Sequence, residues 1–172
     1  MKLRFPESKL RAWAEAFPDQ GEDAVLRGMA EAIRDAGRLS KAQLRAVARW
    51  KSPRSAPHIE GNSEAFVEEV TGFALAAGEE RSRIEALTLL DGVSWPTASV
   101  ILHFFHPEPY PVLDVRALWS VGLAQPGQYT FPFWWAYLRY CRALAARAQV
   151  DMRMLDRALW QYAKERQPAL GS

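Results

Sequence analysis

The stretch LTLLDGVSWPTASVIL, Leu87 to Leu102, decides the fold of the chain. Its two apolar runs have helical spacing, and we expect one helix over 79–90 and a second over 96–105. Gly92 lies where the chain must reverse, and glycine readily adopts the positive φ that such a turn requires. Pro96 suits the first turn of the second helix, because a backbone N–H at that position would have no helical partner. The stretch therefore predicts two helices joined by a very short hairpin.

The rest of the chain also has helical periodicity, and strand alternation is absent. Further helices are expected over 7–17, 22–36, 40–50, 63–77, 115–122, 133–146 and 151–164. Ser40 and Gln43 have the spacing of a capping box, and Gly37 is placed to end the helix before it. The side chains expected to face inward are Val25, Met29, Ala32 and Ile33 in one helix and Phe66, Val67, Val70, Phe73 and Ala74 in another.

These patterns predict an all-α fold, a compact bundle of about eight to nine helices that contains a helix-hairpin-helix motif at about 84–105. We expect a single domain over 1–172, because this length suits one hydrophobic core. The N-terminal helices, within 7–50, and the C-terminal helices, within 131–165, are expected to pack around the motif.

The composition is that of a folded protein, with 49% hydrophobic and 24% charged residues. The net charge of +2 permits nucleic-acid binding without arguing for it, because binding depends on clustered charge. A single cysteine, Cys141, excludes an intrachain disulfide and a cysteine-rich metal site. The N-terminus has no long apolar run, so we expect no signal peptide or membrane span. A cytoplasmic location fits, with nucleoid association if the source is bacterial.

The hairpin is suited to holding an anion. The N-terminus of the second helix presents backbone N–H groups at the positive end of the helix dipole, and phosphate is its usual guest. Glycine lets a phosphate approach the main chain, which gives sequence-independent contact with a nucleic acid. The residues that would bind the phosphate are Gly92, Val93, Ser94 and Trp95. The alternative is that the hairpin is only a tight helical corner.

A larger pattern extends beyond the hairpin. The matching residues are Leu90, Gly92, Val93, Thr97, Ala98, Val100, Ile101 and Leu102, followed by Val112, Leu113, Asp114 and Val115. Together they resemble the helix-hairpin-helix DNA glycosylase superfamily, the endonuclease III-like proteins. The close match covers about 84–121, and the other helices are compatible with that all-helical fold.

The resemblance implies that Asp114 is the catalytic carboxylate of a DNA repair enzyme. Such enzymes flip a damaged or mispaired nucleotide out of double-stranded DNA and cleave its base–sugar bond. A fixed carboxylate stabilises the positive charge that develops on the sugar and orients the attacking water. The alternative for Asp114 is a plain helix N-cap, and the two roles are compatible. The implied partner is damaged or mismatched duplex DNA, bound by a monomer.

Three departures from the family pattern narrow this expectation. Ser94 replaces the second hairpin glycine, which alters the phosphate site. Pro96 occupies the position of the lysine in bifunctional glycosylase–lyases and cannot form a Schiff base, so the expected enzyme is monofunctional. The family's cluster-binding cysteines are absent, so no iron–sulfur cluster is expected. A monovalent cation at the hairpin carbonyls is the one cofactor left open.

The remaining site candidates lie in three places. The loop 51–62 carries Lys51, Arg54, His58 and Asn62, which either touch DNA opposite the hairpin or belong to a solvated connector. Tyr110, Arg116 and Trp119 flank Asp114 and either line a base pocket or pack. His103 and His106 have no third ligand at a fitting spacing, so no metal site is expected.

Two rival functions remain open at this point. The first is a non-catalytic DNA-binding or structure-recognising module that keeps the helix-hairpin-helix scaffold, and Ser94 and Pro96 favour it. The second is a helical protein-interaction domain with a coincidental hairpin, which predicts no salt-dependent DNA affinity.

Overall fold

The computed structural model describes residues 1–18, 21 and 23–168, and within them it contains nine α-helices, two 3-10 helices and no β-strand. The all-α prediction is therefore confirmed. Glu22, where the second predicted helix begins, lies outside the described residues. The helices gather into two compact units, residues 20–108 and residues 1–19 with 109–172. The extent of the single domain, 1–172, stays a prediction.

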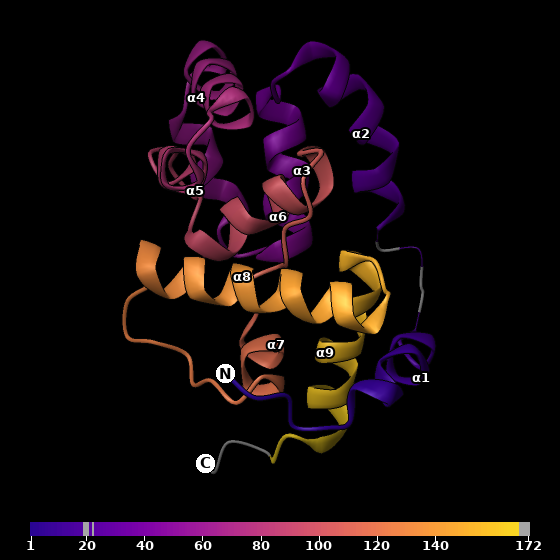
Figure 1. Cartoon of the computed structure of the whole chain (residues 1–172). Coiled ribbons are helices and arrows are strands. Elements are labelled where there is room, and N and C mark those ends of the chain that lie inside the picture. Colours follow the sequence, from indigo (N-terminus) through magenta and orange to yellow (C-terminus); the bar gives the residue numbers. More distant parts are fainter. Residues whose placement is uncertain (19–20, 22, 169–172) are drawn as a thin grey trace. The chain divides into compact units, whose positions relative to one another are not determined.

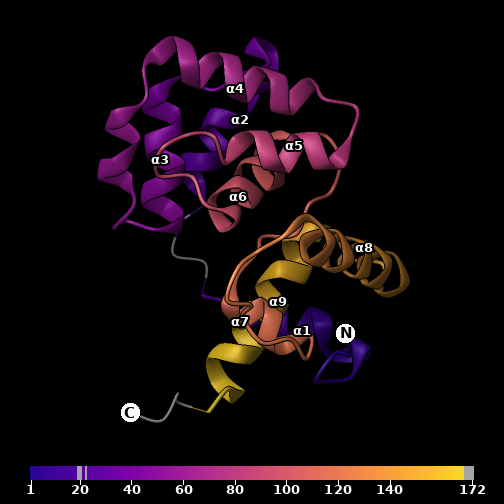
Figure 2. The ribbon, with the colours of Figure 1, turned by 90° about the vertical axis from the view of Figure 1, so that its left-hand side faces the viewer.

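The unit of residues 20–108 is built around the second helix of the hairpin. Its elements are α2 (Ala24–Ala36), α3 (Lys41–Lys51), η2 (Ala56–Gly61), α4 (Glu64–Ala76), α5 (Glu80–Leu87) and α6 (Trp95–Phe105). Helix α6 packs against α2, α3 and α5, while α4 and α5 lie side by side (Figures 1 and 2). The run from Thr97 to Leu102 is buried without interruption, as in a helix enclosed on all sides.

Helix ends in this unit follow the local rules expected from the sequence. Gly37 ends α2 with a left-handed φ of 66°. The Ser40 side chain accepts a hydrogen bond from the Gln43 amide, and the Gln43 side chain accepts one from the Ser40 amide. The predicted capping box is therefore confirmed. The Ser63 side chain caps α4 in the same way, by accepting from the Phe66 amide.

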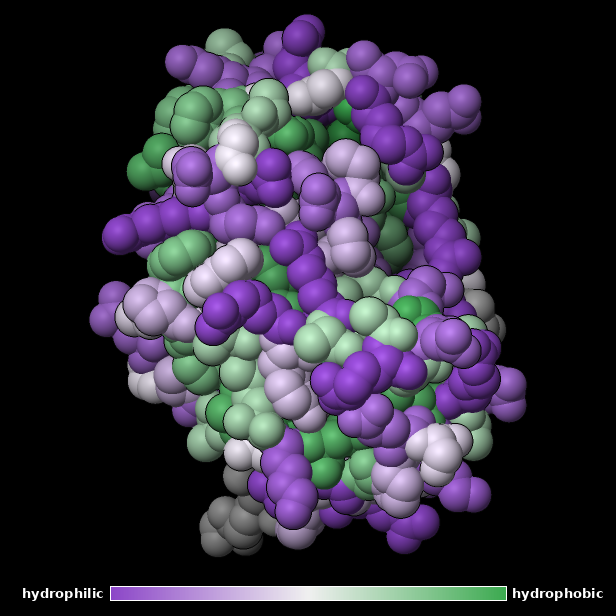
Figure 3. Space-filling model, in the orientation of Figure 1, coloured by the Kyte–Doolittle hydropathy of each residue, from purple (hydrophilic) through white to green (hydrophobic). Residues whose placement is uncertain are grey.

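The predicted inward faces of two helices are partly wrong. Val25 is 61% exposed, and the buried stripe of α2 runs through Leu26, Ala30 and Ile33. In α4, Phe66 and Phe73 are exposed, whereas the other three predicted side chains, Val67, Val70 and Ala74, are buried. Each of these two helices carries more apolar residues than the neighbouring helices cover. Tertiary packing, and not the spacing of apolar residues alone, therefore determines which face is buried. Hydrophobic residues accordingly appear among hydrophilic ones on the surface in Figure 3.

The second unit is organised by the last helix. It contains η1 (Glu7–Lys9), α1 (Leu10–Glu15), α7 (Val115–Ser120), α8 (Phe131–Ala148) and α9 (Met152–Arg166), and α9 packs against α1, α7 and α8. The extended N-terminus is tied to the end of α7, because the Lys2 and Arg4 amides donate to the Val121 and Ser120 carbonyls, each at 2.9 Å. No helix in the described residues is long and apolar enough to span a membrane.

Candidate nucleic-acid interface

The connection between α5 and α6 is longer than the sequence suggests. Helix α5 ends at Leu87 and not at Leu90, because the Leu89 and Leu90 amides donate to carbonyls three residues back. Residues 88–94 form the connection, which we call the hairpin turn. Gly92 has a φ of 79° and the Val93 amide donates to the Leu90 carbonyl at 3.0 Å. The prediction that Gly92 adopts a positive φ is confirmed.

Helix α6 begins without a side-chain cap. Ser94 occupies the N-cap position but makes no capping hydrogen bond, and its hydroxyl lies 3.5 Å from that of Thr97. Pro96 lies in the first turn, as predicted. The N-caps of α3, α4, α7 and α9 accept a backbone N–H through a side chain, whereas those of α1, α2, α5 and α8, like that of α6, do not. The start of α6 is thus a positive helix end whose N-cap side chain does not cover the first-turn amides.

The 52–62 segment, which includes η2, packs directly on the hairpin turn. A Cβ added to Gly92 would meet the Ser55 carbonyl oxygen at 2.9 Å, Cδ1 of Ile59 at 3.0 Å and Cβ of His58 at 3.2 Å. Gly92 is therefore required by its backbone conformation and by this close approach together. The loop is an ordered wall of the hairpin and not a segment opposite it.

Asn62 fixes this wall to the turn. Its Nδ2 donates to the Asp91 carbonyl at 3.0 Å and to the Ile59 carbonyl at 3.1 Å, and its Oδ1 accepts from the Asp91 amide at 2.9 Å. The side chain of Asn62 is buried, so it supports the turn and does not contact DNA. Beside it, a Cβ on Gly61 would meet Oδ2 of Asp91 at 2.5 Å.

The other candidate contact residues in and beside this segment are exposed or half-buried, so they remain accessible to a nucleic acid. His58 and Arg54 are exposed, and His58 lies against Gly92. Lys51 is half-buried in the last turn of α3, and Trp95 is half-buried at the first position of α6. The structure therefore brings a helix start, a glycine turn and His58 together in one unit, with Arg54 on the same segment as His58.

Asp114 belongs to the other unit, where it caps α7. Its Oδ1 accepts from the Arg116 amide at 2.9 Å, so the N-cap role is confirmed. The carboxylate is half-buried. Burial, and to a lesser degree the charge of Asp114, raise the pKa of the Tyr129 phenol. Tyr129 is a neighbour of Asp114 that sequence reasoning missed, because α7 and the turn-rich segment that follows it separate the two in sequence.

The three residues that flank Asp114 in sequence have separate surroundings. The Arg116 guanidinium lies 4.5 Å from the centroid of the Trp160 ring, and the Lys164 ammonium lies 5.1 Å from the same centroid. Trp160 thus holds two cations on the unit that carries Asp114.

Tyr110 and Trp119 are packing residues. Tyr110 is 1% exposed and stacks on Trp134, in agreement with the packing alternative for this residue. Trp119 stacks on Tyr162 and accepts the Arg4 guanidinium over its ring, at 4.5 Å. Both rings are used in packing within their own unit.

The described residues contain no group of three or more His, Cys, Asp or Glu side chains that could hold a metal ion, so His103 and His106 do not belong to such a group. The His103 ring packs on Phe104, and Nδ1 of His106 accepts from the Glu108 amide at 3.0 Å. Comparison of the chain with protein-family models, curated proteins and solved structures gave no match.

Proposed function

We propose that the protein binds duplex DNA through the hairpin turn and hydrolyses the N-glycosidic bond of a flipped damaged or mispaired base. The observation that carries the DNA-binding part is the start of α6. There a positive helix end without a side-chain cap follows Gly92, whose φ is 79°. A backbone phosphate would fit such a site, and the exposed Arg54 and His58 of the adjoining segment supply further cationic or polar contacts.

The hydrolytic part of the proposal rests on Asp114 and on the resemblance of its surroundings to the glycosylase pattern. One oxygen of the carboxylate is held by the Arg116 amide, so the side chain is fixed in orientation. In the proposed reaction the bond between the base nitrogen and C1′ breaks, and the base leaves with the bonding electrons and takes up a proton. Asp114 stabilises the cationic sugar and accepts a proton from the water that attacks C1′.

The chain lacks the lysine that lyase chemistry would use at the hairpin, because Pro96 stands at that position. The products of the proposed reaction are therefore a free base and an intact abasic strand. Borohydride should trap no covalent adduct between the protein and DNA. Trapping of such an adduct would contradict the monofunctional mechanism.

The test uses duplexes that carry alkylated, oxidised, deaminated or mismatched bases, and it measures binding and abasic product separately. We expect Asp114→Asn to lower base release by about a hundredfold or more while leaving DNA affinity unchanged. Asp151→Asn is the matched control, because Asp151 caps α9 through the Met154 amide at 2.7 Å. Base release that survives Asp114→Asn would exclude the proposed role of this carboxylate.

The same panel separates the rival functions. Binding to one or more duplexes without abasic product across the panel favours a non-catalytic module on the same scaffold. The absence of any salt-dependent affinity for DNA favours a protein-interaction domain. If the hairpin binds phosphate, Arg54→Gln should reduce the slope of log K against log salt by about 0.9, whereas the exposed Arg34→Gln should leave it unchanged.

A further inference from the structure

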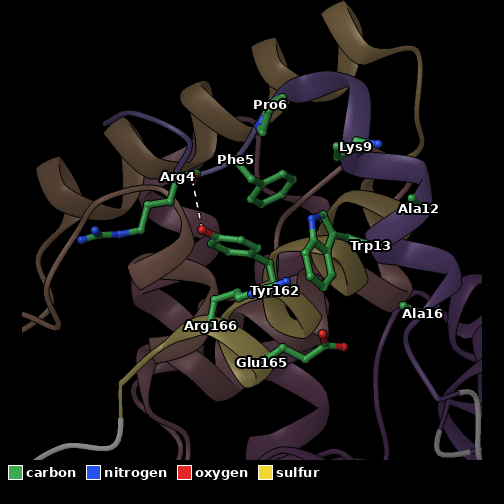
Figure 4. Close-up of a pocket in the computed structure, with 10 residues that line it drawn as sticks. All are labelled: Arg4, Phe5, Pro6, Lys9, Ala12, Trp13, Ala16, Tyr162, Glu165 and Arg166. Carbon is green, nitrogen blue, oxygen red and sulfur yellow. Dashed lines mark hydrogen bonds between the residues drawn. The ribbon is translucent and has the colours of Figure 1, made fainter.

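The unit of residues 1–19 and 109–172 contains a pocket of about 580 Å³ (Figure 4). It lies between the N-terminal segment, α1 and the end of α9. Its lining is Arg4, Phe5, Pro6, Lys9, Ala12, Trp13, Ala16, Tyr162, Glu165 and Arg166. This volume is within the range of sites that take a small organic ligand.

Three aromatic rings from distant parts of the sequence converge in the pocket. The Phe5 and Tyr162 centroids are 4.5 Å apart, and the Trp13 centroid lies 5.3 Å from that of Tyr162 and 6.3 Å from that of Phe5. The Tyr162 hydroxyl donates to the Arg4 carbonyl at 3.1 Å, which fixes the ring (Figure 4). Ala12 and Ala16 also line the pocket, and their small side chains leave space beside these three rings, which we call the aromatic floor. The rings meet tilted or edge to face, with interplanar angles of 41°, 64° and 78°, and together they give an aromatic surface against which a planar ring can pack.

The rim of the pocket is positively charged. Lys9 and Arg166 are exposed, and neither has a carboxylate partner among the described residues. The Arg166 guanidinium lies 5.8 Å from the Trp13 centroid, so it is held beside the aromatic floor. The carboxylate of Glu165 accepts from Nε2 of Gln161 at 2.6 Å. The Nε of Arg4 donates to the Trp119 carbonyl, which directs that guanidinium elsewhere.

We propose that this pocket binds a nucleotide, with the base packed against the aromatic floor and the phosphate at the pocket edge, where Lys9 and Arg166 lie on opposite sides of the rings (Figure 4). The chemistry follows from the two parts of the lining. An aromatic surface recognises a base of any sequence, and an exposed lysine or arginine at the edge of the pocket binds a phosphate. A free nucleotide and an unpaired nucleotide of a DNA strand share this chemistry. The site does not depend on the hairpin turn, which belongs to the other unit.

Calorimetric titration of the full chain with deoxyadenosine monophosphate, deoxyadenosine, inorganic phosphate and a short oligo-deoxyadenylate tests the proposal. We expect the monophosphate to bind at least about tenfold more tightly than the nucleoside or phosphate alone, because only it engages both floor and rim. Tighter binding of the oligonucleotide identifies a strand as the source of the nucleotide. Tighter binding of the monophosphate identifies a free nucleotide.

The variants separate the pocket from general charge effects. Lys9→Glu combined with Arg166→Glu should weaken monophosphate binding by about tenfold or more. Arg34→Glu is the matched control, because Arg34 is also an exposed arginine in the last turn of a helix, and binding should be unchanged. Ala12→Leu fills the pocket without adding charge and should also weaken binding by about tenfold. Both pocket variants should melt within a few degrees of the parent chain.

Three outcomes overturn the proposal. The first is no saturable binding of either the monophosphate or the oligonucleotide. The second is equal binding of the nucleoside and the monophosphate, because the cationic rim then has no role. The third is an equal loss of affinity in Arg34→Glu and in the pocket variants. Failure of the hairpin proposal would show instead in duplex binding and base release, which these titrations do not measure.

Discussion

The side-chain amide of Asn62 pairs with both backbone polar groups of Asp91, donating to its carbonyl at 3.0 Å and accepting from its amide at 2.9 Å. This pairing joins the end of η2 to the hairpin turn across 29 positions of sequence. The Asn62 side chain is buried, its hydrogen bond with Ile59 is buried, and its two hydrogen bonds with Asp91 are partly buried. The shape of the turn therefore depends on a residue outside the two helices it connects.

Removing the Asn62 amide should destabilise the unit of residues 20–108. We expect Asn62→Ala to lower the free energy of unfolding by about 2 kcal/mol, because it leaves the buried Ile59 carbonyl and the partly buried Asp91 backbone groups without the Asn62 side chain as partner. Asn62→Asp should be at least as harmful, since it places a carboxylate oxygen against the Asp91 and Ile59 carbonyls. Gln128→Ala, at an exposed amide, is the control. Urea unfolding measures all three, and a loss below about 0.5 kcal/mol in Asn62→Ala contradicts this account.

Alanine substitutions at three glycines separate the two reasons why position 92 requires glycine, which are the positive φ and the close contacts. Gly28 has open space around it and no positive φ, so Gly28→Ala should be neutral or stabilise α2 by up to about 1 kcal/mol. Gly37 has a φ of 66° and open space, so Gly37→Ala should cost about 1 kcal/mol through backbone strain. Gly92→Ala combines a φ of 79° with close contacts and should cost clearly more.

Unfolding free energies of the three variants measure this order. Equal losses in Gly37→Ala and Gly92→Ala would show that the 52–62 segment yields to the added methyl group. Under the proposed function, Gly92→Ala should also weaken duplex binding, whereas Gly28→Ala should not.

The capping role of Asp114 can be separated from a catalytic one by stability alone. Asparagine is as good an N-cap as aspartate, so Asp114→Asn should leave the melting temperature nearly unchanged. Asp114→Ala should cost about 1 kcal/mol, like Asp151→Ala at the start of α9. Thermal unfolding of these three variants checks this. A large loss of stability in Asp114→Asn would mean that the carboxylate is needed structurally, and its activity could not then be interpreted as chemistry.

High pH should destabilise the unit that carries Cys141. Burial raises the pKa of the Cys141 thiol well above its ordinary value, and burial also raises the pKa of the Tyr137 phenol. Above about pH 9 the unfolded chain releases these protons while the folded chain keeps them, so the unfolded state binds fewer protons. Below about pH 9 these two groups should therefore leave the free energy of unfolding unchanged. Above about pH 9 each group should lower the free energy of unfolding by up to about 1.4 kcal/mol for every pH unit.

Urea unfolding on both sides of this pH, with Tyr137→Phe as the comparison, measures the slope. The variant should show a shallower fall above about pH 10, where the phenol contributes. The buried Cys141 thiol should also resist a thiol reagent in the folded protein and react once urea unfolds it. Rapid labelling of the folded protein at neutral pH would show that this core opens readily.

Local rules made part of the structure predictable. The positive φ of Gly92, the place of Pro96 and the capping box at Ser40 all follow from short-range backbone geometry. The cap at Asp114 belongs to the same class. These features need no knowledge of the neighbours that a segment meets in three dimensions.

Long-range packing made the rest unpredictable. Val25 and Phe73 have helical spacing that fits a buried face, and only the placement of neighbouring helices leaves them exposed. The pairing of Asn62 with Asp91 leaves no trace in local periodicity. The same holds for the pocket, where Phe5 and Trp13 meet Tyr162 from the opposite end of the chain.

The hydrogen bonds between Asn62 and Asp91 also define how the hairpin could be transplanted. A fragment of residues 80–105 carries both helices but lacks the wall against which Gly92 packs and the amide that holds Asp91. A portable form of the motif must therefore include at least residues 55–105. In a foreign helical scaffold such a fragment should keep the turn geometry better than residues 80–105 alone.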